Sequence, residues 1–159
     1  MTLDQLNDME AAEAVNCFLG CCGSLEWASR MNELRPFGSL EILLDSADRE
    51  WLRLRETDWM EAFGAHPRIG ERSNSAASRQ EQAHVYASGD SMTRALAAAN
   101  AEYDKRFGFI YIVFATGKTP EQILENLEKR LGNSRDVEIR NAVAEQMKIT
   151  RNRLQRMVQ

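Results

Sequence analysis

Apolar residues recur at every third or fourth position along most of the chain, which is the spacing of helices that bury one face. In the first half, serine or threonine precedes several of these runs, and glycine or proline follows them, as expected at helix ends. The pattern predicts four helices here: one from about Asp8 to Cys22, one capped by Ser24 and ended by Pro36, a short one opened by Ser39, and one capped by Thr57 that stops at Gly64.

The second half shows the same pattern after a polar loop from Gly64 to Ser75. It predicts helices from about Ser78 to Ala87, from Ser91 to Phe107, from Pro120 to Leu131 behind a Thr119 cap, and from about Arg135 to Met157. The last of these is expected to bury four apolar side chains, Ile139, Val143, Met147 and Leu154.

One segment, Phe107 to Ala115, departs from this pattern because it is continuously apolar and rich in β-branched and aromatic residues. Such a run is typical of a buried strand, but the sequence offers no second strand for it to pair with. We therefore interpret it as a buried connector, extended or irregular, whose backbone groups need hydrogen-bond partners. A ligand rich in amides and carbonyls could supply some of them. The predicted fold is an all-α bundle of several helices in a single domain, residues 1–159.

Composition narrows the classes of function. The chain is 43% hydrophobic and 28% charged, with a net charge of −4, so it is expected to be a soluble globular protein that does not bind nucleic acid. No apolar run is long enough to span a bilayer, and neither end carries a recognisable targeting signal, so we expect a cytoplasmic protein that does not bind membranes. The three clustered cysteines, Cys17, Cys21 and Cys22, are expected to be buried reduced thiols rather than metal ligands.

Candidate chemistry centres on His66, which lies in the polar loop and is one of only two histidines. Histidine can donate or accept a proton near neutral pH, and Pro67 restricts the backbone that aims the ring. Glu81 could set the tautomer and charge of the imidazole. Each residue also has a structural interpretation: His66 as an ordinary loop histidine, and Glu81 as the partner of Ser78 in a capping box.

Other polar residues carry weaker signals. His84 lies on a predicted helix and has no metal-ligand spacing around it, so no metal site is expected. Arg153 lies at the edge of a buried stripe, where it could bind a carboxylate through two hydrogen bonds. The chain has no glycine-rich phosphate loop, serine nucleophile motif or dinucleotide fingerprint. With these motifs absent, the function that the sequence still favours is an acid–base reaction on a small organic molecule.

Four motifs in order resemble one family. They are His66-Pro67-Arg68-Ile69-Gly70, Ser78-x-x-Glu81-Gln82, Tyr103-x-x-Arg106-Phe107-Gly108-Phe109 and Glu145-x-x-Lys148-Ile149-x-x-x-Arg153-Leu154, supported upstream by Trp27 and Arg35-Pro36-Phe37. Together they cover nearly the whole chain and resemble the 2-oxo-4-hydroxy-4-carboxy-5-ureidoimidazoline (OHCU) decarboxylases of urate breakdown. The resemblance implies an all-α fold, a homodimer, and a cofactor-independent carboxy-lyase that gives (S)-allantoin.

The resemblance also assigns roles to residues. It implies that His66 is the catalytic proton donor, and we pair it with Glu81 as the residue that orients and charges the ring. It implies substrate contacts from Pro67, Ser78, Arg79, Gln80, Glu81, Gln82, Tyr111, Ile112, Val113, Phe114, Ala115 and Arg153. Loss of CO2 leaves electrons that neighbouring C=O and C=N groups of the substrate can accept, so no cofactor is required. Delivery of the proton from one side would give one enantiomer.

Two other functions fit the residues. One is a hydrolase or isomerase that uses the same histidine and glutamate on another small ureide. The other is a non-catalytic helical dimer or binding module, for which the amphipathic helices alone would suffice. The polar loop around His66 counts against the second, because a packing module has no need of it.

Overall fold

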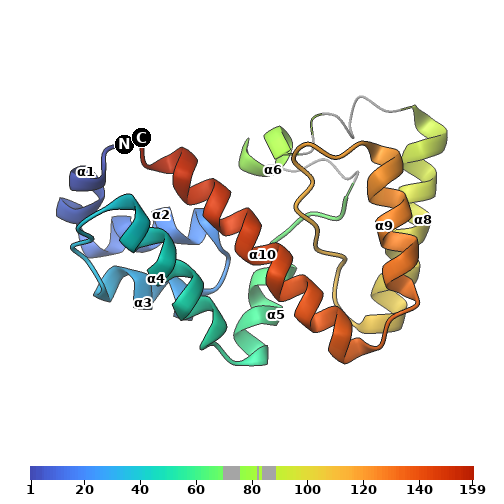
Figure 1. Ribbon diagram of the computed structural model, residues 1–159, viewed down its shortest axis with the longest axis horizontal. Coiled ribbons are helices and arrows are strands. Elements are labelled where there is room, and N and C mark those ends of the chain that lie inside the picture. Colours follow the sequence, from blue (N-terminus) through green and yellow to red (C-terminus); the bar gives the residue numbers. More distant parts are fainter. Residues whose placement is uncertain (70–75, 82, 84–88) are drawn as a thin grey trace. The chain divides into compact units, whose positions relative to one another are not determined.

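The computed structural model describes residues 1–69, 76–81, 83 and 89–159, and within these ranges the regular structure is entirely helical (Figure 1). The predicted all-α fold is therefore confirmed. The helices are α1 (Leu3–Asp8), α2 (Ala11–Cys21), α3 (Leu25–Glu33), α4 (Leu40–Leu52), α5 (Glu56–Gly64), α6 (Ala76–Glu81), α8 (Asp90–Phe107), α9 (Pro120–Leu131) and α10 (Arg135–Met157).

The chain forms two compact units. The first comprises Met1–Ala62 and Gln146–Gln159, and the second comprises Phe63–Glu145. Helices α5 and α10 each contribute residues to both units.

Three of the five predicted helix caps are confirmed. The hydroxyl groups of Ser24, Ser39 and Thr119 accept hydrogen bonds from backbone N–H groups three residues ahead, at 3.1–3.2 Å. Thr119 also forms a capping box with Gln122, and Pro120 occupies the first helical position. The same device begins α1 with Thr2 and Gln5, a helix that the apolar pattern did not predict.

Two predicted caps are wrong. Helix α5 begins at Glu56, so Thr57 lies inside it; the Asp58 carboxylate accepts the backbone N–H of Arg55 at 3.2 Å and fixes the helix start earlier. Helix α6 begins at Ala76, so Ser78 lies within its first turn and is not the cap of a box with Glu81. Residues 82 and 84–87 of the predicted helix to Ala87 lie outside the described residues.

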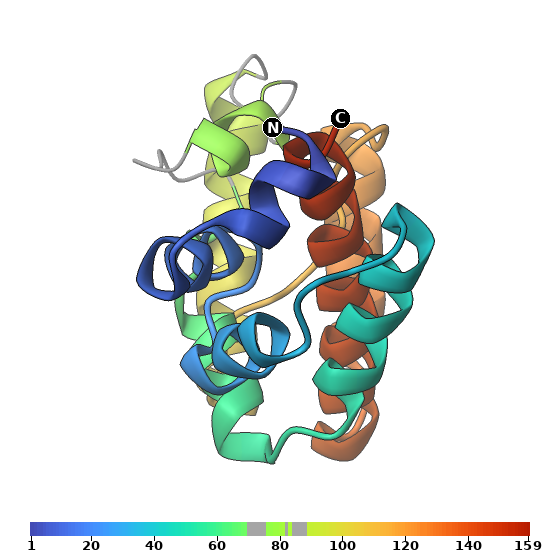
Figure 2. The same cartoon turned by 90° about the vertical axis from the view of Figure 1, so that its left-hand side faces the viewer.

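The first unit has its own aromatic core. Helix α2 packs against α3, and α3 against α4 (Figure 2). The Phe18 and Trp27 rings meet edge to face with centroids 5.9 Å apart, and the Trp27 indole N–H donates to the Ala47 carbonyl at 3.1 Å. As predicted, Cys21 and Cys22 are buried free thiols, whereas Cys17 is half-buried.

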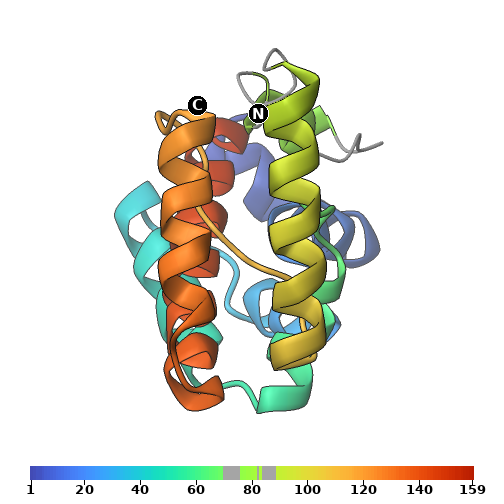
Figure 3. The same ribbon diagram turned by 90° about the vertical axis from the view of Figure 1, so that its right-hand side faces the viewer.

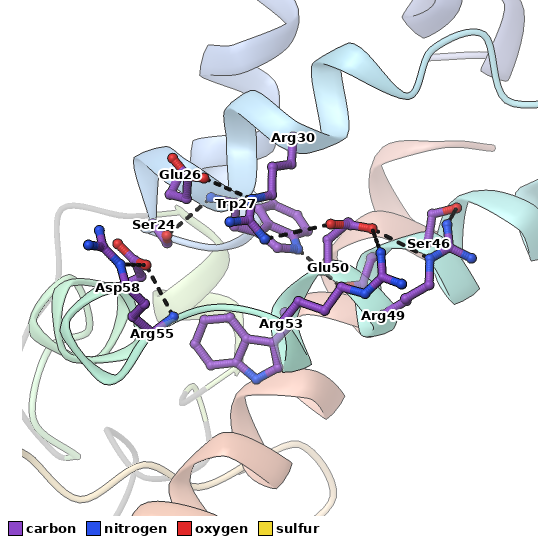
Figure 4. Close-up of polar contacts among 12 residues, drawn as sticks. Ser24, Glu26, Trp27, Arg30, Ser46, Arg49, Glu50, Arg53, Arg55 and Asp58 are labelled. Atoms are coloured by element: carbon purple, nitrogen blue, oxygen red, sulfur yellow. Dashed lines mark hydrogen bonds and ion pairs between the residues drawn. The ribbon is translucent and has the colours of Figure 1, made fainter.

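A carboxylate on the inner side of α4 is balanced by arginines. Glu50 is 7% exposed and lies within 3.8 Å of Arg30 and within 3.4 Å of both Arg49 and Arg53 (Figure 4). Three cations around one carboxylate explain why an acidic side chain can be buried here. The arginines are themselves a third or more exposed, so the cluster is one edge of the unit rather than part of its core.

The second unit is built around α8 and α9, which lie side by side, and the 108–119 segment joins the end of α8 to the start of α9 (Figure 3). This segment has no regular secondary structure, which confirms the prediction of a buried connector between helices. The buried rings of Tyr103, Phe107, Phe109 and Tyr111 form one cluster, with neighbouring centroids 4.5–6.3 Å apart.

Candidate functional site

The segment that carries His66 is held in the second unit by contacts before and after the histidine. The backbone N–H of His66 donates to the Phe63 carbonyl at 3.2 Å, and the Phe63 ring packs on Phe109 with centroids 5.7 Å apart. The chain turns here because α5 ends at Gly64 and Pro67 disfavours a helical residue before it. His66 and Pro67 are both half-buried, so the imidazole sits at the edge of a packed region.

The residues after Pro67 are fixed to α8. The Arg68 guanidinium donates two hydrogen bonds to one oxygen of Asp104, at 2.7 and 2.5 Å. Ile69 is buried, and its carbonyl accepts from the Asn100 side chain at 3.3 Å. These contacts restrict the backbone downstream of His66 in the way that a catalytic histidine requires.

A pocket of about 690 Å³ opens beside this segment, along one face of α8. Among its lining residues, Arg68 and Ile69 come from the His66 segment and Thr93, Ala97, Asn100, Ala101, Asp104 and Lys105 from α8. None of the described residues predicted to contact substrate is among these lining residues. The pocket therefore adjoins the His66 segment.

Helix α6 carries four of the predicted substrate contacts. Ser78 is 3% exposed and Glu81 is half-buried, whereas Arg79 and Gln80 are exposed. Residues three apart share a helix face, so Ser78 and Glu81 form the inward face of this helix. Gln82 and His84 lie outside the described residues.

The connector supplies the remaining contacts predicted in the second unit. Tyr111, Ile112, Val113 and Ala115 are buried, and Phe114 is half-buried. Two cationic side chains satisfy carbonyl groups of this segment: Arg130 Nη1 donates to the Ile112 oxygen at 2.7 Å, and Lys118 Nζ donates to the Phe114 oxygen at 2.6 Å. The protein itself thus provides hydrogen-bond partners for two carbonyl groups of the connector, a role for which the sequence analysis suggested a ligand.

A buried carboxylate anchors the arginine under the connector. Glu138 Oε1 accepts from Arg130 Nε and from the Tyr103 hydroxyl, both at 2.6 Å, and Oε2 accepts from Asn133 and Asn141 at 2.9 and 2.7 Å. Burial alone would raise the pKa of Glu138, but these hydrogen bonds and the Arg130 charge lower it below its usual range. Glu138 is therefore ionised at neutral pH, and Arg130 is its counter-ion.

The tyrosines of the connector region act as neutral donors. Burial raises the pKa of Tyr103 and of Tyr111 above the usual range, so both phenols stay protonated. The Tyr111 hydroxyl donates to the Asn126 side chain at 2.5 Å, which ties the connector to α9. Neither phenol is placed to act as a base near pH 7.

Arg153 belongs to the first unit, on the last part of α10. It is half-buried and lies close enough to Cys21 and Cys22 to lower their pKa values slightly. Burial has the larger effect and raises the pKa of each thiol to about 12, so both remain protonated and weakly nucleophilic. The predicted role of Arg153 in substrate binding stays a prediction.

Sequence reasoning missed the Arg130–Glu138 pair, although the sequence contains a signal for it. Arg130 continues the buried stripe of α9 formed by Ile123 and Leu127, at helical spacing. Glu138 likewise falls on the inner face of α10, beside buried Ile139 and Ala142. A charged residue on an apolar stripe in each of two successive helices is the pattern that identifies a buried ion pair.

Two kinds of feature are absent from the described part of the chain: a cluster of metal-ligand side chains and a membrane-spanning helix. Its His, Cys, Asp and Glu side chains include no group of three placed to hold a metal ion. No helix within the described ranges is long and apolar enough to cross a bilayer.

The family model for OHCU decarboxylase matches residues 7–155. The "Uric acid degradation bifunctional protein TTL" of Arabidopsis thaliana is 39% identical over 145 residues, which are 86% of this chain and 45% of that protein. The 2-oxo-4-hydroxy-4-carboxy-5-ureidoimidazoline decarboxylase of Haloferax volcanii is 30% identical over 160 residues, covering 97% of this chain and 94% of that one. A bifunctional uric acid degradation protein of Bacillus sp. (strain TB-90) is 28% identical over 98% of this chain and 32% of its own length. The chain thus spans less than half the length of both bifunctional relatives.

Solved structures agree with the sequence comparisons. An OHCU decarboxylase crystallised in the presence of (S)-allantoin is 35% identical, superposes with a TM-score of 0.82, and is matched over 94% of this chain and 98% of that one. An (S)-allantoin synthase structure shares the fold, with a TM-score of 0.78 at 16% identity, over 100% of this chain and 54% of that one.

Proposed function

The chain belongs to the OHCU decarboxylase family, and on that basis we propose that it removes CO2 from 2-oxo-4-hydroxy-4-carboxy-5-ureidoimidazoline to give (S)-allantoin. The observation that carries this proposal is the likeness to the decarboxylase crystallised with (S)-allantoin, which extends over 98% of that chain. The family match from residue 7 to residue 155 also includes every proposed site residue from His66 to Arg153.

The chemistry needs no cofactor because the substrate carries its own electron sink. The bond between the hydroxyl-bearing ring carbon and the carboxylate breaks, and CO2 leaves. Its electron pair forms a C=C bond to the neighbouring ring carbon, while the C=N electrons move onto nitrogen, which takes a proton. The hydroxyl group then loses its proton and becomes a C=O group, as the neighbouring carbon, which carries the ureido group, gains a proton and becomes the stereocentre of allantoin. An enzyme accelerates this sequence by stabilising the developing negative charge and by placing the proton on one face.

We assign the proton transfer to His66. Its backbone is held on one side through Phe63 and on the other through the Arg68–Asp104 pair, which supports a fixed attachment point for the ring. Glu81 is the proposed partner that orients the imidazole and favours its charged form. It is half-buried, and it shares a helix face with buried Ser78.

Substrate binding is assigned to polar and backbone groups around these two residues. The proposed contacts come from Pro67, from Ser78 to Gln82, and from the connector residues Tyr111 to Ala115. The ureido and imidazoline groups of the substrate are rich in N–H and C=O, which match the backbone groups of a connector without regular secondary structure. Arg153 is the proposed ligand of the departing carboxylate, through a charge-assisted pair.

The proposal extends to assembly and location. By the resemblance, the active form is a homodimer in the cytoplasm that needs no metal or organic cofactor. Light scattering on the purified chain tests the dimer directly, because an 18.1 kDa protomer and a pair of them differ twofold in mass.

The deciding experiment generates the substrate fresh with urate oxidase and hydroxyisourate hydrolase and then adds this protein. Ultraviolet absorbance follows loss of the substrate, and circular dichroism follows formation of one allantoin enantiomer. Faster decay together with a growing optical signal supports the proposal. Decay at the uncatalysed rate with racemic product contradicts it, and a panel of other ureides then tests the hydrolase or isomerase alternative.

A further inference from the structure

Arg130 and Glu138 form a deeply buried ion pair in the described part of the chain. Arg130 also contacts the connector, which belongs to the proposed site. The side chains of the pair are 7% and 0% exposed, and the shortest N–O distance between them is 2.6 Å. A pair of this kind contributes little net stability, because the cost of removing both charges from water offsets their attraction. Net stability therefore does not by itself explain why Arg130 and Glu138 are buried here.

The other contacts of Arg130 lead to the connector. While Nε is directed to Glu138, Nη1 donates to the Ile112 carbonyl at 2.7 Å. The guanidinium also lies over the Tyr111 ring, with its central carbon 4.7 Å from the ring centroid. One rigid planar group thus holds both the backbone and a side chain of two successive connector residues.

A second cation holds the connector two residues further on, where Lys118 Nζ donates to the Phe114 carbonyl. The segment has no regular secondary structure and joins the end of α8 to the start of α9 (Figure 3). Arg130 and Lys118 thus hold the carbonyl groups of two alternate residues, and the backbone groups of Val113 lie between these two fixed points.

We propose that Arg130 is a positioning residue for substrate binding: by fixing the Ile112 carbonyl against Glu138, it directs the backbone groups of Val113 to the ureido part of the substrate. This inference rests on the proposed function. It assigns Arg130 no contact with the reacting atoms, and its effect passes through the connector. It predicts that losing the Arg130 hydrogen bond weakens binding of substrate and product while the His66 chemistry continues.

The test uses the double substitution Arg130→Met with Glu138→Gln. Removing Arg130 alone would leave a buried unpaired carboxylate and destabilise the fold, whereas the neutral pair avoids that charge. Methionine still packs on the Tyr111 ring, and glutamine still accepts from Tyr103. The double variant loses the donor to Ile112 and also the acceptor for Asn133 and Asn141, which is why its melting temperature is measured beside its binding. Lys129→Met is the matched control, because it removes the neighbouring cation of α9, whose partner Glu125 is exposed.

Three measurements are compared across these variants and the unmodified chain: KM and kcat in the coupled assay, affinity for (S)-allantoin by calorimetry, and thermal melting. For the double variant we expect KM and the allantoin Kd to rise about tenfold or more, with kcat within about threefold of the starting value. Lys129→Met is expected to change none of them. Arg130→Lys keeps the charge but not the second donor arm, and it is expected to raise KM in the same direction.

A folded double variant with unchanged KM and unchanged allantoin affinity would overturn the positioning role while leaving the proposed function intact. If the double variant does not fold, Arg130→Lys decides the question by the same criterion. Absence of turnover in the unmodified chain would overturn the proposed function, and this inference with it.

Discussion

At the residue scale, a substitution of His66 removes the imidazole but keeps two contacts that hold this segment, because they involve the backbone and a neighbouring side chain. The hydrogen bond to Phe63 uses the backbone N–H, and the Arg68–Asp104 pair belongs to another side chain. These contacts persist when the imidazole is replaced. We expect His66→Asn to lower kcat/KM by about 10²–10⁴-fold, the usual contribution of a positioned proton donor.

The measurement for His66→Asn is the coupled assay together with the far-ultraviolet spectrum and the melting temperature. A variant that melts like the unmodified chain but no longer accelerates decay supports the assignment. Retention of most of the turnover would remove His66 from the mechanism and direct attention to another donor.

Glu81 gives a second residue-scale prediction, because its two suggested roles lead to different results. Helix α6 begins at Ala76, so Glu81 is not the reciprocal partner of an N-cap at Ser78. Glu81→Gln should therefore cost activity, about tenfold to a hundredfold through a misoriented imidazole, with little change in the melting temperature. Rate and melting are measured on the same preparation. A normal rate with a lowered melting temperature would assign Glu81 a structural role only.

The sequence suggested the residues of the proposed site, and the contacts that it missed follow a physical rule. His66 and Pro67 were identifiable because few residues combine a titratable ring with a restricted backbone. The apolar stripes of α9 and α10 could have marked Arg130 and Glu138 as a buried pair, but nothing in the sequence indicates that Arg130 also donates to the Ile112 carbonyl. Hydrogen bonds between segments far apart in sequence become visible only in the folded chain.

At the element scale, helix ends provide the most direct check of local energetics. The Thr119 hydroxyl accepts the Gln122 N–H at 3.1 Å, and the Gln122 side chain accepts the Thr119 N–H at 2.9 Å. Thr119→Ala should therefore destabilise the fold by about 1 kcal/mol. Thr57→Ala is the control: the sequence suggests a cap there, but the residue is exposed inside α5.

Chemical denaturation of both variants measures the difference. The expected result is a lower midpoint for Thr119→Ala and a midpoint near that of the unmodified chain for Thr57→Ala. Equal losses would contradict the assigned start of α5 at Glu56.

The elements also show where pattern reasoning succeeds. Helices α8, α9 and α10 were predicted to within one residue because each is long enough for its apolar stripe to repeat. Helix α1 has six residues and buries only Leu6, so no periodicity exists to detect. Its one sequence signal was the Thr2 and Gln5 spacing of a capping box. A short helix is therefore recognised in the sequence by its capping residues, and a long helix by its repeating apolar positions.

At the scale of the whole molecule, the open question is whether the chain unfolds as one domain. Two compact units are distinguishable, yet α5 and α10 are continuous helices with residues in each. A continuous helix couples the units, because melting one part of it exposes the hydrogen bonds of the next turn. We therefore expect a single cooperative transition, with tryptophan fluorescence and far-ultraviolet dichroism giving the same midpoint.

The three tryptophans make this test informative, since Trp27, Trp51 and Trp59 all lie in the first unit. Fluorescence thus follows the first unit alone, whereas dichroism follows the helices of both. Coincident transitions mean that the second unit, with the His66 segment and the connector, is lost together with the first. Separate transitions would show that the unit holding most of the proposed site has a stability of its own, and the single-domain prediction would then be wrong.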